Sequence, residues 1–187
     1  GLFFETINAA GVLQVPMVMS VWDDGHGISV PKKYQTTKES ISEILKGFEE
    51  TEEKSGYKIY KVKGWDYPGL CQTYLDATNY ARKHHTPVLI HVEEVTQPQG
   101  HSTSGSHERY KSKERLEWEK EYDGIAQFRK WILGYKKEYG KELATEEELA
   151  NIEKQAKKTA RDAKKEAWSD FITPIKKEQE EAIQLLG

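Results

Sequence analysis

The sequence predicts an α/β fold in which a parallel sheet is flanked by helices and followed by a charged helical C-terminal region. Two stretches follow the same plan: a helix leads to a proline and then to a nearly continuous apolar run, at residues 17–22 and 88–92. Such runs are typical of strands that are buried on both faces of a parallel sheet. The alternation of helices and strands along the chain favours the same architecture.

The first half of the chain is expected to hold two helices and an edge strand between the buried runs. A helix covers residues 2–12, and Thr36 or Thr37 caps the next helix. Residues 57–62 alternate apolar and polar side chains, which indicates a half-exposed or edge strand. A helix from about residue 69 to 84 then leads into the second buried strand.

The second half is expected to be a loop followed by charged helices. Small, polar and helix-breaking residues fill the loop 97–105. Asp123 is expected to cap one helix, Thr145 and Glu148 form the capping box of another, and Pro174 should interrupt that second helix. The predicted division is a partial domain over residues 1–122 and its helical extension over residues 123–187.

The composition excludes several classes of protein. No apolar run approaches the roughly 18 residues that cross a bilayer, and Cys71 is the only cysteine, so no disulfide can form within the chain. A net charge of -3 lacks the basic excess of nucleic-acid-binding proteins. Five Trp, ten Tyr and five Phe supply a core. We therefore expect a soluble, cytoplasmic, globular protein without membrane or nucleic-acid partners.

The first candidate site is Asp-Asp-Gly-His-Gly at residues 23–27, directly after the first predicted strand. Ligands bind at the C-terminal ends of parallel strands. A carboxylate beside glycines suits a hard cation such as Mg²⁺. The same residues also make an ordinary Asp-Gly turn, and the residues by themselves leave both interpretations open.

The second candidate is His101, which lies among glycines and hydroxyl residues after the second strand. This setting favours contact with phosphate oxygens or proton transfer, although a solvated surface histidine would look the same. No pair of histidines has the i, i+4 spacing of a helical zinc site. The sequence also contains no P-loop, dinucleotide fingerprint or nucleophile elbow.

Together, the two candidate segments resemble one family. Residues 1–31 are similar to the second half of the thiamine diphosphate motif in the alpha part of 2-oxo acid dehydrogenases, the decarboxylating component of the pyruvate and branched-chain complexes. His101-Ser102-Thr103-Ser104 matches that family's phosphorylation loop, and Tyr110-Lys111-Ser112 resembles its continuation. The resemblance implies a partial thiamine diphosphate-binding fold.

The resemblance also implies a role for individual residues. Asp24 would bind Mg²⁺ through its side chain, His26 would bind it through its backbone carbonyl, and Ile28 would lie at the cofactor. His101 would be catalytic, contacting the cofactor's diphosphate and supporting acyl transfer to a lipoyl group. Asp24 itself departs from the family, because Asp23-Asp24 stands where the family has Asn-Asn.

Further implications concern modification, completeness and partners. Ser102 and Ser112 match positions that kinases modify in mitochondrial relatives. The family's first Mg²⁺ ligand would lie just upstream of Gly1, so the chain is expected to be an inactive fragment. The implied partners are the beta part, a lipoyl acyltransferase, a 2-oxo acid substrate (pyruvate or branched-chain) and a second copy in a homodimer. The alternative is a non-catalytic scaffold module that kept the fold.

Overall fold

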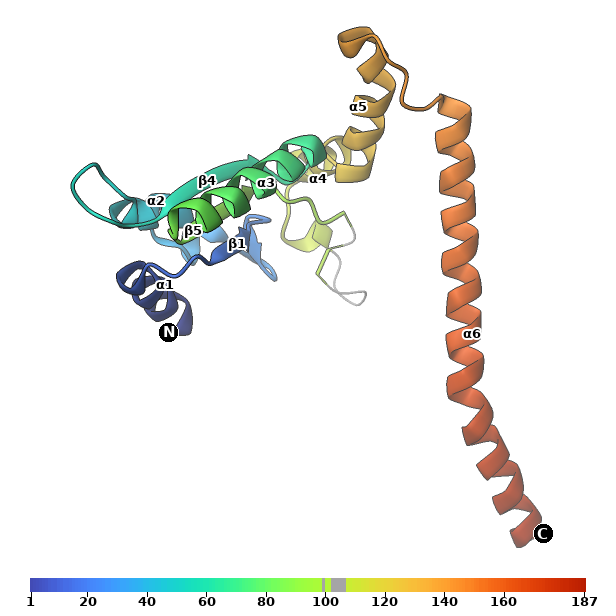
Figure 1. The fold of residues 1–187 in the computed structure, drawn as a ribbon. Helices are drawn as coiled ribbons and strands as arrows, with labels where there is room; N and C mark the ends of the chain where they lie inside the picture. Colours follow the sequence, from blue (N-terminus) through green and yellow to red (C-terminus); the bar gives the residue numbers. More distant parts are fainter. Residues whose placement is uncertain (99, 102–106) are drawn as a thin grey trace. The chain divides into compact units, whose positions relative to one another are not determined.

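In the computed structural model, residues 1–98, 100–101 and 107–187 are described, and they form two compact units, Gly1–Trp131 and Ile132–Gly187 (Figure 1). The first unit holds a parallel sheet whose order is β1-β5-β4. Its strands are β1 (Val18–Trp22), β5 (Val88–Glu93) and β4 (Lys58–Lys63). The α/β prediction with a parallel sheet is confirmed, and residues 57–62 do mark an edge strand.

The central strand is β5, and every residue from Val88 to Val92 in it is buried. Val88, Ile90 and Val92 pack with one apolar cluster, whereas Leu89 belongs to a second cluster on the other face. The continuous apolar run therefore predicts this strand correctly. The same expectation is wrong for β1, in which Trp22 is 64% exposed, because β1 lies at an edge of the described sheet.

Helices cover both faces of the sheet in the first unit (Figure 1). On one face, α1 (Leu2–Leu13) buries Ile7 and Ala10. On the other face, α3 (Tyr67–His84) buries Ala77 and Ala81. The small alanine side chains allow the backbone of α3 to lie close to the strands.

The helix expected after Thr36 is shorter than predicted. It consists of α2 (Ile41–Ile44) and a following 3-10 turn, η3 (Leu45–Phe48). The capping prediction for Thr36 or Thr37 is wrong, because Lys38 has a left-handed φ of 58° that breaks any helix begun there. Ser40 caps α2 instead, and its hydroxyl accepts a hydrogen bond from the Glu43 amide at 3.4 Å.

Three helices follow the second candidate loop: α4 (Lys113–Glu121), α5 (Gly124–Tyr139) and α6 (Glu146–Leu186). Asp123 caps α5 as predicted, since its carboxylate accepts from the Ala126 amide at 3.0 Å. The predicted capping box of Thr145 and Glu148 opens α6. The remaining short elements are β2 (His26–Gly27), β3 (Val30–Pro31), η1 (Lys32–Tyr34), η2 (Thr37–Glu39) and η4 (His107–Arg109).

One helix continues where the sequence predicts a break. α6 runs through Pro174, although proline has no N–H for the carbonyl of Asp170. Beside it, the Thr173 hydroxyl donates to the Ser169 carbonyl at 2.6 Å, one turn back along the helix. None of the described helices combines the length and apolar character that crossing a membrane requires.

Candidate functional site

The first candidate segment begins where β1 ends, beside the end of β5. The Asp23 amide donates to the Val92 carbonyl at 2.8 Å, and the Val95 amide donates back to the Asp23 carbonyl at 3.0 Å. These bonds continue the β1–β5 ladder beyond the strands, and they bring the two C-terminal ends together. This edge of a parallel sheet is where α/β proteins bind ligands.

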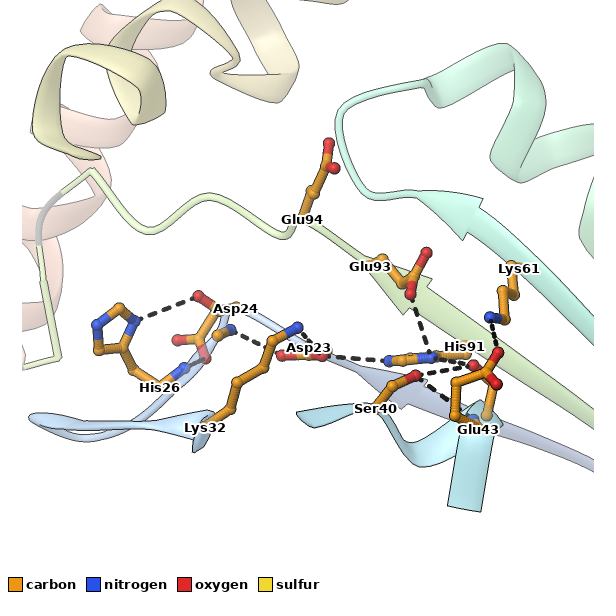
Figure 2. A network of polar contacts seen from close by, with 12 residues as sticks. Asp23, Asp24, His26, Lys32, Ser40, Glu43, Lys61, His91, Glu93 and Glu94 are labelled. Carbon is orange, nitrogen blue, oxygen red and sulfur yellow. Dashed lines mark hydrogen bonds and ion pairs between the residues drawn. The ribbon is translucent and has the colours of Figure 1, made fainter. Parts of the chain in front are cut away.

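Asp23 lies at the centre of a polar network, which we call the β5 cluster: Asp23, Lys32, Ser42 and His91. Figure 2 shows the contacts of Asp23 with Lys32 and His91. The Asp23 Oδ2 atom lies 3.0 Å from Lys32 Nζ and 3.2 Å from His91 Nε2, while Oδ1 accepts from the Gly25 amide at 2.7 Å. Burial raises the pKa of Asp23, but hydrogen bonds from His91, Lys32 and Gly25 outweigh it and hold this pKa well below its usual range. Asp23 is therefore ionised, and both of its oxygens are engaged within the protein.

His91 is fully buried within β5, and both of its ring nitrogens have partners. Nε2 faces Asp23, and Nδ1 lies 2.9 Å from the Ser42 hydroxyl. Serine, histidine and aspartate also form hydrolytic triads, but Ser42 is only 3% exposed, so no substrate can reach its hydroxyl. The network therefore holds Asp23 in place. A histidine within an otherwise apolar run was the sequence signal for it, because a buried ring nitrogen requires a partner.

Asp24 and His26 both present oxygen atoms at this turn. Asp24 Oδ1 accepts from the His26 amide at 3.0 Å, and its Oδ2 makes no hydrogen bond to the described residues. His26 lies opposite Pro31 in the β2–β3 hairpin. Because proline has no N–H, that residue cannot donate to the His26 carbonyl. A carboxylate and a backbone carbonyl are the hard donors that Mg²⁺ prefers.

The hairpin that carries these donors has an unusual backbone at its tip. Ile28 has a φ of 59°, a region that β-branched residues rarely occupy, and its side chain is 64% exposed. Gly25 has a φ of 81°, which only glycine adopts without strain. Strained residues of this kind are concentrated at functional sites, because the surrounding structure must hold them.

The cation site is incomplete within the described residues. None of their His, Cys, Asp and Glu side chains form a group of three or more that could hold a metal ion. Asp24 and His26 fit Mg²⁺ as two of its ligands, and the remaining ligands would come from elsewhere. A cavity of about 140 Å³ lies beside them, and its lining includes Trp22, Asp24, His26 and Lys32.

No hydrogen bond, ion pair or ring contact joins His101 of the second candidate loop to the first candidate segment among the described residues. His101 is exposed, and it makes no hydrogen bond, ion pair or ring contact with Asp24 or His26 in that part of the chain. Its expected convergence with Asp24 therefore stays a prediction. Ser102 lies outside the described residues, whereas Ser112 caps α4 by accepting from the Arg115 amide at 3.2 Å.

Arg115 on α4 contacts the Asp24 turn as part of a second group of charged residues. We call this group the α4 cluster, and it consists of Lys111, which lies just before the helix, Arg115 and Glu119. Arg115 Nη2 donates to the Asp24 carbonyl at 2.9 Å, and its Nε donates to Glu119 Oε1 at 2.8 Å. Lys111 Nζ lies 2.8 Å from both carboxylate oxygens of Glu119. Sequence reasoning missed these residues, because charged helical residues that reach a site look like those that face solvent.

Comparison with known proteins connects this geometry to one family. The family model described as "Dehydrogenase E1 component" matches residues 1–176. The chain is 27% identical over 165 residues to a protein of Rickettsia felis named pyruvate dehydrogenase E1 component subunit alpha, covering 88% of this chain and 46% of that protein.

Two further relatives give the same result. Over 163 residues the chain is 26% identical to the protein of the same name from Rickettsia bellii, covering 87% of this chain and 45% of that protein. Over 134 residues it is 29% identical to 2-oxoisovalerate dehydrogenase subunit alpha 2, mitochondrial, of Arabidopsis thaliana, covering 71% of this chain and 26% of that protein. The chain thus spans less than half the length of these relatives. The match over nearly its whole length shows that this chain belongs to the dehydrogenase E1 component family.

Proposed function

We propose that this chain is the alpha part of a thiamine diphosphate-dependent 2-oxo acid dehydrogenase, which acts on pyruvate or a branched-chain 2-oxo acid and passes the acyl group to lipoyl-lysine. The observation that supports this most directly is the Asp24 turn. It presents a carboxylate oxygen that has no hydrogen-bond partner among the described residues, at the C-terminal end of β1 and in a chain of the E1 family. The names of the relatives include both pyruvate and 2-oxoisovalerate dehydrogenases, so they leave both substrate classes in the proposal.

In this proposal, Asp24 and His26 bind the Mg²⁺ that accompanies the diphosphate, and Ile28 lies beside the cofactor. The bound cofactor supplies the electron sink for decarboxylation. Asp23 is not a ligand, because Lys32 and His91 already engage its carboxylate. Its charge is matched within the protein, so only Asp24 adds negative charge to the site relative to the Asn-Asn of the family.

His101 has a separate role in the proposal. It is exposed, and in sequence it follows β5, whose C-terminal end lies beside the Asp24 turn. An exposed imidazole in this position is able to contact phosphate oxygens and to move protons during acyl transfer. We expect it to serve the second half-reaction, transfer to the lipoyl group, more than the decarboxylation.

We also propose that activity requires partners. The chain spans less than half of the relatives' length, and the described residues supply only part of a cation site. A beta part, separate or fused, would complete the site, and a lipoyl acyltransferase would accept the product. By itself, the cytoplasmic 187-residue chain is expected to be catalytically silent.

Cofactor binding by the assembled protein tests the cation site. Asp24→Ala should weaken the binding of thiamine diphosphate at saturating Mg²⁺ by about tenfold or more, as measured by calorimetry, because one hard ligand is lost. Asp24→Asn should retain most of the affinity, since an amide oxygen also binds Mg²⁺. Asp162→Ala, which alters an exposed carboxylate on α6, serves as the control. If Asp24→Ala binds thiamine diphosphate as tightly as the wild type does, the assignment of Asp24 as a ligand is contradicted.

Separating the two half-reactions tests the catalytic assignment. His101→Ala should reduce lipoyl acylation more than decarboxylation in the assembled enzyme. Equal loss of both would remove His101 from the acyl-transfer role. An assembled wild-type protein that decarboxylates neither pyruvate nor branched-chain 2-oxo acids would instead support the alternative, a non-catalytic scaffold module that kept the fold.

A further inference from the structure

We propose that Arg115 is a positioning residue that fixes the backbone of the Asp24 turn, so that the Asp24 carboxylate and the His26 carbonyl are held for a cation. This inference rests on the proposed function. Arg115 lies on α4, and its Nη2 donates to the Asp24 carbonyl at 2.9 Å across 91 positions of sequence. It is thus a direct link between α4 and the backbone of the proposed ligand.

The guanidinium is itself held on three sides. Its Nε donates to Glu119 Oε1 at 2.8 Å, its Nη2 donates to Asp24, and its plane lies over the Trp118 ring with 4.7 Å to the ring centroid. A planar fork that uses separate nitrogens for separate acceptors loses little conformational freedom when it binds. Arg115 therefore fixes the direction of the Asp24 carbonyl more tightly than a flexible single donor would.

Glu119 is positioned in turn by a buried ion pair. Its side chain and that of Lys111 are each only 2% exposed, and Lys111 Nζ lies 2.8 Å from both Glu119 oxygens. A buried carboxylate needs partners for all of its charge. Lys111 supplies that charge on its own, so Glu119 stays paired when Arg115 is replaced. The role of Arg115 can therefore be tested without removing the buried pair.

The residues around the contact explain why the backbone needs an external support. Gly25, next to Asp24, has a left-handed φ of 81°, and a Cβ at this position would lie 3.9 Å from both terminal nitrogens of Arg115. The ring of Tyr110, just before α4, lies 6.0 Å from the His26 ring. The turn is thus covered by residues 110–115, and its only charged hydrogen-bond donor from α4 is Arg115 among the described residues.

The contact also brings a positive charge close to the additional negative charge of the site. Asp24 adds a negative charge where the family has asparagine, and Arg115 brings a positive charge to the backbone of that same residue. A cation held near a diphosphate benefits from ligands whose geometry is fixed before it binds. Arg115 supplies this fixed geometry in the proposal, whereas Asp24 and His26 supply the ligand atoms.

Hydrogen exchange and cofactor affinity, measured on the full protein, test the inference with Arg115→Met and Arg115→Lys. Arg115→Met should raise amide exchange in residues 24–27 by about tenfold or more, since a charged hydrogen bond is lost. It should weaken Mg²⁺–thiamine diphosphate binding by a similar factor and leave exchange in β5 unchanged. Arg115→Lys should recover only part of both, because a lysine lacks the fork. Lys113→Met removes a charge from the same helix at a side chain that is 85% exposed, and it should change neither.

Each alternative result has a distinct meaning. Unchanged exchange in residues 24–27 would overturn the inference. Raised exchange in β5 as well as in the turn, or raised exchange in the turn with unchanged cofactor affinity, would show that Arg115 only stabilises the fold, and would overturn it too. A wild-type protein that binds no cofactor would overturn the proposed function instead, and the exchange of residues 24–27 would then decide separately whether Arg115 holds the turn.

Discussion

The β5 cluster and the α4 cluster approach the same two residues by different physical means. The β5 cluster binds the side chain of Asp23 through a histidine and a lysine, whereas the α4 cluster binds the backbone of Asp24 through an arginine. In the β5 cluster the carboxylate is 12% exposed, and its lysine partner is 37% exposed. In the α4 cluster the carboxylate and its lysine are both 2% exposed.

This difference determines how each cluster should respond to the loss of one member. The ammonium group of the partly exposed Lys32 can be solvated, so the β5 cluster can rearrange when its carboxylate is lost. The fully buried Lys111 cannot be solvated in this way, so the loss of its carboxylate partner costs more free energy. The comparison therefore predicts a large destabilisation for the α4 cluster and smaller ones for the β5 cluster.

The largest expected effect comes from Glu119→Gln. This change leaves the buried Lys111 without its counter-charge, and it places an amide N–H₂ against the lysine donors. We expect the free energy of unfolding to fall by about 3–5 kcal/mol, as measured by chemical denaturation of the full chain. Glu117→Gln is the matched control on the same helix, because Glu117 is 69% exposed and forms a long contact of 4.0 Å with Lys113.

The control should change the free energy of unfolding by less than about 0.5 kcal/mol. Replacing both members of the buried pair, with Lys111→Met and Glu119→Leu together, should restore part of the loss, because no fully buried charge is then left uncompensated; Arg115, which also loses its bond to Glu119, is 29% exposed. A loss from Glu119→Gln no larger than that from Glu117→Gln would contradict the contrast drawn between the two clusters.

An intermediate effect is expected from Asp23→Asn. The amide can still accept a hydrogen bond from His91, but the charge that faces Lys32 is lost. We expect the free energy of unfolding at pH 7 to fall by about 1.5–3 kcal/mol, the usual range for hydrogen bonds to a charged group. Asp76→Asn, which changes an exposed aspartate on α3, is the control.

The pH dependence of the same variant tests the cause of the effect. The pKa of Asp23 is lowered in the folded state, so its ionised form stabilises the protein above the unfolded-state pKa of about 4. That contribution is lost as the pH falls through the lower, folded-state pKa. In the absence of divalent cations, the stability difference between wild type and Asp23→Asn should therefore shrink from pH 7 to pH 3. A difference that stays constant over this range would assign the effect to packing instead.

The smallest expected effect comes from Ser42→Ala, which removes the hydroxyl 2.9 Å from His91 Nδ1. Among the described residues, the remaining polar partner of this nitrogen is then the Glu93 carboxylate, at 3.7 Å. We expect a loss of about 1 kcal/mol in the free energy of unfolding, the typical value for a neutral hydrogen bond. Ser55→Ala, at an exposed turn residue, should have no measurable effect. A loss that exceeds that of Asp23→Asn would reverse the order of importance within the β5 cluster.

Much of the secondary structure follows from local patterns in the sequence. The apolar run of β5, the alternation in β4 and the caps at Asp123 and Thr145 all predict the observed elements. These features depend on neighbours within a few residues, so periodicity and capping rules are sufficient to find them. The predictions fail at β1 and Pro174, because exposure of a strand and continuation of a helix depend on what surrounds them.

The candidate site, too, can be predicted only in part from the sequence. The sequence indicates the Asp-Asp-Gly-His-Gly turn, since residue type and position after a strand are both visible in it. The different roles of Asp23 and Asp24 cannot be predicted from the sequence, because the two residues are chemically identical. It depends on which carboxylate meets His91 and Lys32 in the folded chain.

The sequence by itself determined the class of fold, the family and the segment that carries the proposed cation ligands, because these depend on residue types at short spacing. Only the tertiary structure decided that α4 supports this segment through Arg115 and that β5 engages Asp23 through His91. Contacts between residues far apart in sequence depend on how the strands and helices pack. The residues that form such contacts show no periodic pattern in the sequence.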